Sequence, residues 1–161
     1  MSSRIRPHTL LARILLAVLA GAIVLSWPAL WLESMASAQS WPEMAHLQYP
    51  VLVGAIIATL PGLAILGLAY KMLLLVEQKK VFSPRALQLI SYARHICLAA
   101  TVYYLAASIL FNAISPLNHI SLLALEILAL ALAAAGWVFF LVTGTIFQAA
   151  TEAWVENELT V

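Results

Sequence analysis

Glu126 is the one acidic residue inside a long apolar stretch, which runs from Ile120 to Phe147. An ionised carboxylate in the hydrocarbon of a membrane costs roughly 2.5–3.5 kcal/mol or more, so this group should be protonated, paired or in contact with water. Acids within membranes are candidates for proton or ligand sites. The alternatives are a structural hydrogen bond that locks two helices, or a side chain shallow enough to reach the outer interface.

Three polar side chains recur at helical spacing in the preceding apolar stretch: Tyr104, Ser108 and Asn112. If the third and fourth helices pack antiparallel, these groups lie near the depth of Glu126 and can form hydrogen bonds with it. Ordinary interhelical hydrogen bonds, each worth about 0.6 kcal/mol, are the simpler interpretation. The candidate intramembrane polar site therefore comprises Glu126, Tyr104, Ser108 and Asn112.

Other groups that could do chemistry form no recognisable constellation. Glu43-x-x-His46 places a carboxylate and an imidazole on one helical face, but a di-iron site needs two such pairs, so a surface pair is favoured. The chain has no His-Glu-x-x-His sequence and no motif for a serine or cysteine nucleophile. Its single cysteine, Cys97, excludes an intramolecular disulfide. We expect no catalytic residue, cofactor or metal, and no enzymatic activity.

The composition indicates which solvent surrounds these residues. Of the 161 residues, 64% are hydrophobic and 9% are charged, and the mean hydropathy is +0.99. Soluble domains are about half apolar and about a quarter charged. A water-soluble core of this size cannot bury so much apolar surface, so lipid must surround most of the chain.

Four apolar stretches are long enough to cross a bilayer at about 1.5 Å per residue: residues 10–32, 50–71, 95–114 and 120–147. We expect an all-α, single-domain membrane bundle of four antiparallel helices. Residues 33–49 are expected to form a polar loop, with a turn or short interfacial helix at Trp41-Pro42-Glu43. Residues 72–94 form the connector between the two middle spans, and residues 148–161 form an acidic tail.

The first apolar stretch has a second interpretation. A basic head, an apolar run and then Ala36-Ser37-Ala38 resemble a signal peptide with its cleavage site. The run exceeds the roughly 7–15 apolar residues of a signal peptide, which favours a retained helix. Cleavage after Ala38 stays an alternative, and it would leave three spans with the new N-terminus outside.

The basic residues indicate how the chain is oriented. With four spans, the head, the connector and the tail share one side of the membrane, and the two opposite loops contain no Lys or Arg. Cytoplasmic segments carry the excess of basic residues, so both termini are expected in the cytoplasm. The eight basic residues on that side or at its interface are Arg4, Arg6, Arg13, Lys71, Lys79, Lys80, Arg85 and Arg94.

The connector is expected to form the tip of a helical hairpin. Ser83 is a good N-cap and Pro84 suits a first helical position, so a helix should begin at Pro84. The acidic tail could pair with the basic tip, although anionic lipid headgroups compete for the same charges. Lipid anchoring is the default expectation and docking of the tail is the sharper hypothesis. The candidate cytoplasmic contact surface comprises Lys79, Lys80, Phe82, Ser83, Arg85, Glu152 and Glu156.

Two short motifs resemble a known family. The step Lys80-Val81-Phe82-Ser83-Pro84 and the ending Glu156-Asn157-Glu158-Leu159-Thr160-Val161 resemble domain of unknown function family 2975, a group of bacterial four-span membrane proteins. Trp154-Val155 and the long, Ala-rich fourth span depart from the family pattern. Genes of this family often lie beside one for a small helix-turn-helix regulator. The resemblance therefore implies a bacterial inner-membrane protein with an accessory, sensing or regulatory role.

Two functions follow as hypotheses. The first is a non-enzymatic accessory or regulatory protein whose cytoplasmic hairpin and tail contact a soluble partner of helix-turn-helix type, or a second copy of the chain, without binding nucleic acid itself. The alternative is a small transporter or channel subunit that uses Glu126, Tyr104 and a helix kink at Pro61-Gly62. Four spans would have to oligomerise to form a pathway.

Overall fold

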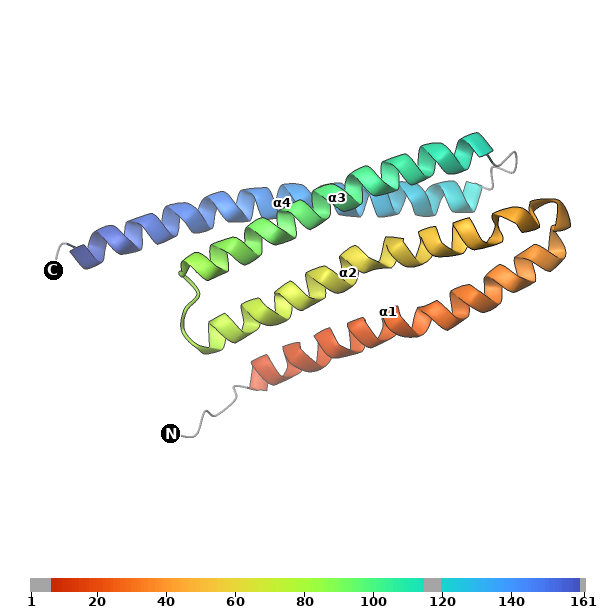
Figure 1. Cartoon of the computed structure of the whole chain (residues 1–161). Helices are drawn as coiled ribbons and strands as arrows, with labels where there is room; N and C mark the ends of the chain where they lie inside the picture. Colours follow the sequence, from red (N-terminus) through yellow and green to blue (C-terminus); the bar gives the residue numbers. More distant parts are fainter. Residues whose placement is uncertain (1–6, 115–119, 160–161) are drawn as a thin grey trace. The chain divides into compact units, whose positions relative to one another are not determined.

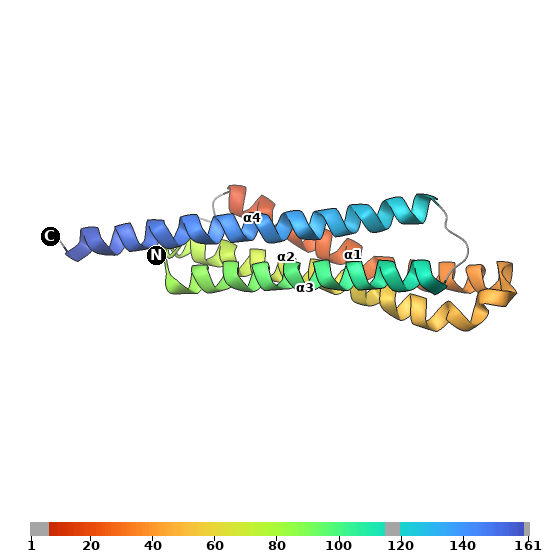
Figure 2. The same ribbon diagram turned by 90° about the horizontal axis from the view of Figure 1, so that it is seen from above.

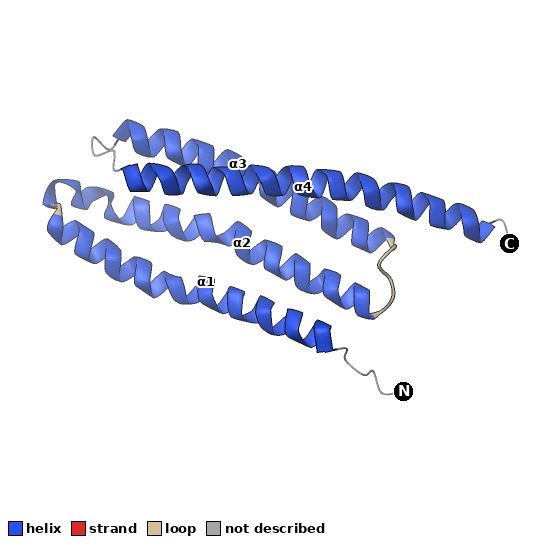
Figure 3. Ribbon diagram, turned by 180° about the vertical axis from the view of Figure 1, so that it is seen from behind, coloured by secondary structure: helices blue, strands red, loops and turns tan. Residues whose placement is uncertain are grey.

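The computed structural model describes residues 7–114 and 120–159, and within these ranges the chain is helical apart from short connections (Figures 1 and 3). The elements are α1 (Pro7–Ser40), the 3₁₀ helix η1 (Pro42–Leu47), α2 (Gln48–Glu77), α3 (Pro84–Ile114) and α4 (Ile120–Leu159). Four helices in the described ranges are long and apolar enough to cross a membrane. The all-α class is confirmed, and the antiparallel four-helix bundle stays a prediction.

The helices extend beyond the expected apolar spans. The prediction of a polar loop at residues 33–49 was wrong, because α1 continues to Ser40 and η1 then leads directly into α2. Residues 33–40 are mostly small or unbranched and suit a helix, and the Ser40 hydroxyl donates to the Ala36 carbonyl at 2.9 Å. Pro42 ends α1 because a residue before proline avoids helical angles, and Trp41 has φ −131° and ψ 74°. The short helix expected near Pro42 is present as η1.

Contacts within the chain divide it into two compact units, Met1–Tyr70 and Lys71–Val161. In the first unit, the Trp27 indole donates to the Thr59 hydroxyl at 3.0 Å. The Arg13 guanidinium lies 5.8 Å from the centre of the Tyr70 ring. Later residues of α1 therefore meet earlier residues of α2, so the two helices run in opposite directions. A Cβ added at Gly62 would lie 3.5 Å from Ile23 Cδ1, and α2 continues as a helix through Pro61.

The second unit is organised by a seam of small side chains on α3. Alanines recur every seven residues along this helix. One further residue lies between successive alanines, four residues after the first and three before the next, and together they form a stripe along one face. A seven-residue repeat is the pattern by which two helices keep one face together as they supercoil. The buried members of the stripe are Ala86, Ile90, Ala93, Cys97 and Ala100.

The facing side of α4 is also built from small residues. Half-buried positions recur every seven residues at Ala129, Gly136, Thr143 and Ala150. A Cβ added at Gly136 would lie 3.1 Å from Cys97 Sγ, so α3 and α4 meet closely at this point. Because Cys97 meets Gly136 whereas the earlier Ile90 meets the later Gly144, the two helices run antiparallel (Figure 2).

Large apolar side chains point outward on all four long helices. Leu25 is 75% exposed on α1, and Ile109 on α3 and Leu132 on α4 are similarly exposed. A soluble monomer rarely exposes so much contiguous apolar surface. These side chains fit a chain whose outer surface is covered by lipid.

Candidate functional site

The structure joins three of the four polar residues predicted within the membrane spans. The Ser108 hydroxyl donates a hydrogen bond to Glu126 Oε2 at 2.7 Å. The Asn112 amide donates to the same oxygen at 3.2 Å. Ser108 and Asn112 lie one turn apart on α3, whereas Glu126 lies near the start of α4. The antiparallel register therefore brings the three side chains to one depth.

The two donors are held in place by their own helix. The Asn112 amide also donates to the Ser108 carbonyl at 2.8 Å, which restricts its rotation. Both bonds to Glu126 end on a single carboxyl oxygen. A serine hydroxyl can donate to a carboxylate or accept from a carboxylic acid, so Ser108 suits either protonation state of Glu126. The site can hold one acidic group within an apolar span and join α3 to α4.

Tyr104 lies one turn before Ser108 on α3 and is half-buried. Its ring meets the Tyr103 ring edge to face, with the ring centres 5.7 Å apart. A part in a proton or ligand site stays a prediction for Tyr104.

The connector between α2 and α3 has a defined turn that was not predicted from the sequence. Lys79 has φ +56°, the left-handed region that side chains other than glycine rarely adopt. The Lys80 amide donates to the Leu75 carbonyl at 2.9 Å, and the Lys79 amide donates to the Val76 carbonyl at 3.1 Å. These two bonds are the Schellman pattern that closes the end of a helix. The turn explains why α2 ends at Glu77, six residues beyond the expected apolar span at residues 50–71.

Replacing Lys79 with glycine should stabilise this turn. A left-handed residue with a Cβ costs about 1–2 kcal/mol, and the greater freedom of glycine in the unfolded chain offsets part of that gain. We expect Lys79→Gly to raise the free energy of unfolding in detergent by about 0.5–1 kcal/mol. Lys80→Gly is the matched control and should not stabilise. A Lys79→Gly protein less stable than the wild type would contradict the assigned turn.

The start of α3 confirms the predicted cap. The Ala86 amide donates to Ser83 Oγ at 3.4 Å, and Pro84 is the first helical residue. Phe82, just before the cap, packs on Phe147 of α4 with ring centres 5.7 Å apart. This contact depends on the register between α3 and α4, which the sequence analysis had not assigned.

The predicted contact surface lies at this end of the second unit. Lys79, Lys80 and Arg85 are exposed. Glu152 accepts a hydrogen bond from Gln148 of its own helix at 3.2 Å. The side chain of Glu156 lies outside the described residues, but the backbone of α4 continues to Leu159, past the level at which α3 begins (Figures 1 and 2). Docking of the tail onto the basic tip stays a prediction.

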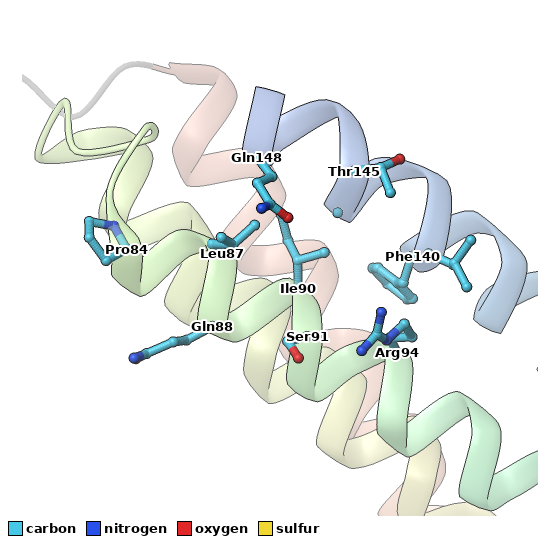
Figure 4. Close-up of a pocket in the computed structure, with 11 residues that line it drawn as sticks. Pro84, Leu87, Gln88, Ile90, Ser91, Arg94, Phe140, Thr145 and Gln148 are labelled. Atoms are coloured by element: carbon cyan, nitrogen blue, oxygen red, sulfur yellow. The ribbon is translucent and has the colours of Figure 1, made fainter. Parts of the chain in front are cut away.

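An open groove of about 430 Å³ lies between α3 and α4 near the start of α3 (Figure 4). Arg94 and Phe140 lie at one end of the groove, and Leu87 and Gln148 lie toward the other. Arg94 is the charged residue of its lining. Arg94 was expected on the basic side of the membrane or at its interface, but the groove could not be predicted, because neighbours on two helices can be named only once their register is known.

Glu43 and His46, the carboxylate and imidazole pair, both lie in η1. His46 Nδ1 lies 3.2 Å from the backbone carbonyl oxygen of Glu43, and both residues are exposed. Among the described residues, no group of three or more His, Cys, Asp or Glu side chains could hold a metal ion. His119 and the turn predicted at residues 115–119 lie outside the described part of the chain.

These helices fit a multi-pass membrane protein of the all-α class. A family model described as "Protein of unknown function (DUF2975)" matches residues 32–161, from the later part of α1 to the end of the chain. The chain belongs to this family, which confirms the resemblance drawn from its central and terminal motifs. No curated protein and no solved structure matches it.

Proposed function

We propose that this protein is a non-enzymatic accessory or regulatory protein of the bacterial inner membrane. Its four helices form an antiparallel bundle with both termini in the cytoplasm. The placement of all eight Lys and Arg residues on one side, or at its interface, supports this orientation. Membership of the DUF2975 family supports the architecture.

The hairpin tip is the observation that carries this proposal. Its turn is fixed at both ends, by the Schellman bonds at Lys79 and by the Ser83 cap. Phe82 is 47% exposed, and its neighbours along the chain, Lys79, Lys80 and Arg85, are also exposed. An exposed aromatic ring and exposed cations on one short, preorganised turn suit a partner surface that is apolar and acidic.

A cytoplasmic regulator of helix-turn-helix type is the partner that we propose, with the end of α4 as part of the same surface. Glu152 is exposed on α4, and Glu156 follows one helical turn later in the sequence. In this arrangement the regulator binds nucleic acid and the membrane protein does not. A second copy of the chain is the alternative partner.

Neutralising the tip should weaken binding of the regulator. The test mixes the detergent-purified protein with a purified helix-turn-helix regulator of the small type that often accompanies genes of this family, and measures binding by light scattering. We expect Lys79→Gln/Lys80→Gln, or deletion of residues 153–161, to weaken binding at least tenfold, since each loses contacts worth about 1.4 kcal/mol or more. Lys71→Gln, which removes a cation away from the tip, is the matched control. Equal binding by all variants would contradict the proposal.

The second candidate function is a small transporter or channel subunit. The observation that favours it is the hydrogen-bonded Glu126 within an apolar span. Such a pathway would require several copies of the chain, because four helices enclose little space.

Glu126→Gln separates the two functions. The glutamine side chain has nearly the same shape as glutamate and can still accept the Ser108 bond, so we expect helix packing to be preserved. If Glu126 carries protons, proton-dependent flux into proteoliposomes should be lost in this variant and kept in the wild type. Wild-type flux in the variant, with unchanged packing, would rule out a proton site at Glu126.

A further inference from the structure

The groove between α3 and α4 has the charge and the polarity gradient of a phospholipid site. Arg94 is the charged residue of its lining, and the lining contains no acidic side chain. Arg94 is also the last Lys, Arg, Asp or Glu residue along α3. It therefore marks the level at which the helix passes from its polar part into its apolar part. A phospholipid phosphate lies at that same level in a membrane.

The lining changes character on either side of Arg94. Toward the start of α3 the groove mixes the polar side chains Ser91 and Gln148 with apolar ones such as Leu87. In the other direction, Phe140 and Leu141 lie at the level of Arg94. One turn further inward on the same faces, Leu98 is 41% exposed and Val138 is 50% exposed. Polar side chains therefore lie on the outer side of Arg94, whereas the side chains named on its inner side are all apolar, as a lipid headgroup and acyl chain lie on either side of the phosphate.

We propose that this groove binds one anionic phospholipid of the inner leaflet. The Arg94 guanidinium contacts the phosphate, because its planar set of donors matches phosphate oxygens and the bond is charge-assisted. Ser91 and the free oxygen of the Gln148 amide face the headgroup. The acyl chain follows Leu141, Leu98 and Val138 into the bilayer. Basic pockets between membrane helices are a recurring form of lipid site.

The charges around the groove favour an anionic ligand over a zwitterionic one. Arg85, Lys79 and Lys80 lie at the same end of the unit. The facing acid of α4 is Glu152, which is one turn beyond the groove and accepts its bond from Gln148. The proposed site gives a specific position for the contact with anionic headgroups that the sequence led us to expect. It is independent of the partner at the hairpin tip, because its residues differ from those at the tip.

The test uses native mass spectrometry of the full-length protein in detergent, with dioleoyl-phosphatidylglycerol and dioleoyl-phosphatidylcholine at equal concentrations. We expect the wild type to keep one phosphatidylglycerol molecule in preference to phosphatidylcholine. Arg94→Gln should lower the association constant for phosphatidylglycerol about tenfold or more, since it removes a charged hydrogen bond. Arg85→Gln, which removes one nearby cation that does not line the groove, should weaken binding far less than Arg94→Gln does.

A second variant guards against a folding defect in Arg94→Gln. Leu141→Trp fills the groove and leaves every charge in place, so it should also lose the bound lipid. The proposal is overturned if both variants bind as the wild type does, or if Arg85→Gln loses as much binding as Arg94→Gln. It is also overturned if excess glycerol 3-phosphate displaces the lipid, because the site would then recognise free phosphate rather than a lipid.

Discussion

Gly136→Leu should separate α3 from α4. A Cβ at this position already lies 3.1 Å from Cys97 Sγ, so the three further carbons of leucine have no space unless the helices move apart. Overpacking typically costs about 1–3 kcal/mol, and we expect a loss at the upper end, about 3 kcal/mol. The measurement is the free energy of unfolding in mixed detergent micelles, followed by loss of helicity in titration with sodium dodecyl sulfate.

The chain offers a matched control for this change. Gly67 also lies inside a membrane-spanning helix, but a Cβ added there meets nothing within 4 Å. Gly67→Leu should therefore leave stability nearly unchanged, which separates the effect of close packing from that of a bulkier helix. If both variants lose the same stability, the close approach of Cys97 and Gly136 is not the cause.

Cys97 provides the reciprocal test. Cys97→Ala removes the sulfur that a Cβ at position 136 would meet. We expect Gly136→Ala to cost more in the wild-type background than in Cys97→Ala, with a coupling energy of about 0.5–1 kcal/mol. The coupling would show that Cys97 acts through its shape, since it lies buried in the seam.

The sequence predicted what depends on local pattern. Apolar length indicated four helices, and Ser83-Pro84 indicated the start of α3, because a cap needs only neighbours in the chain. The same reasoning placed Ser108 and Asn112 beside Glu126, once antiparallel packing was assumed. These predictions needed residue types and helical spacing and no detailed register.

Features that depend on register between helices were not predicted. The stacking of Phe82 on Phe147 and the groove beside Arg94 each join residues far apart in the sequence. The alanine repeat on α3 was present in the sequence and could have indicated the seam, but it was hidden by the general abundance of alanine. The prediction of a loop at residues 33–49 was wrong because polar residues were taken as a sign of irregular structure. Residues 33–40 suit a helix and continue α1.

The double variant Ser108→Ala/Asn112→Leu should destabilise the second unit by about 2–3 kcal/mol. It removes both hydrogen-bond donors to Glu126 Oε2 and leaves the carboxyl group without the two bonds that the structure provides there. An unsatisfied buried polar group costs about 1–3 kcal/mol, and a charged one within a span costs more. The measurement is again the free energy of unfolding in detergent. Thr101→Val is the control, because the Thr101 hydroxyl donates within its own helix, to the Cys97 carbonyl at 2.8 Å.

Adding Glu126→Leu to that double variant should restore much of the lost stability. Replacing every member of a buried polar group with apolar side chains is often nearly neutral, whereas removing only its partners is costly. Recovery would show that the penalty arises from the stranded carboxyl group rather than from altered packing at Ser108 and Asn112. A triple variant no more stable than the double variant would contradict that cause. Recovery would also show that the protein folds without Glu126. Glu126 would then have a role other than joining α3 to α4.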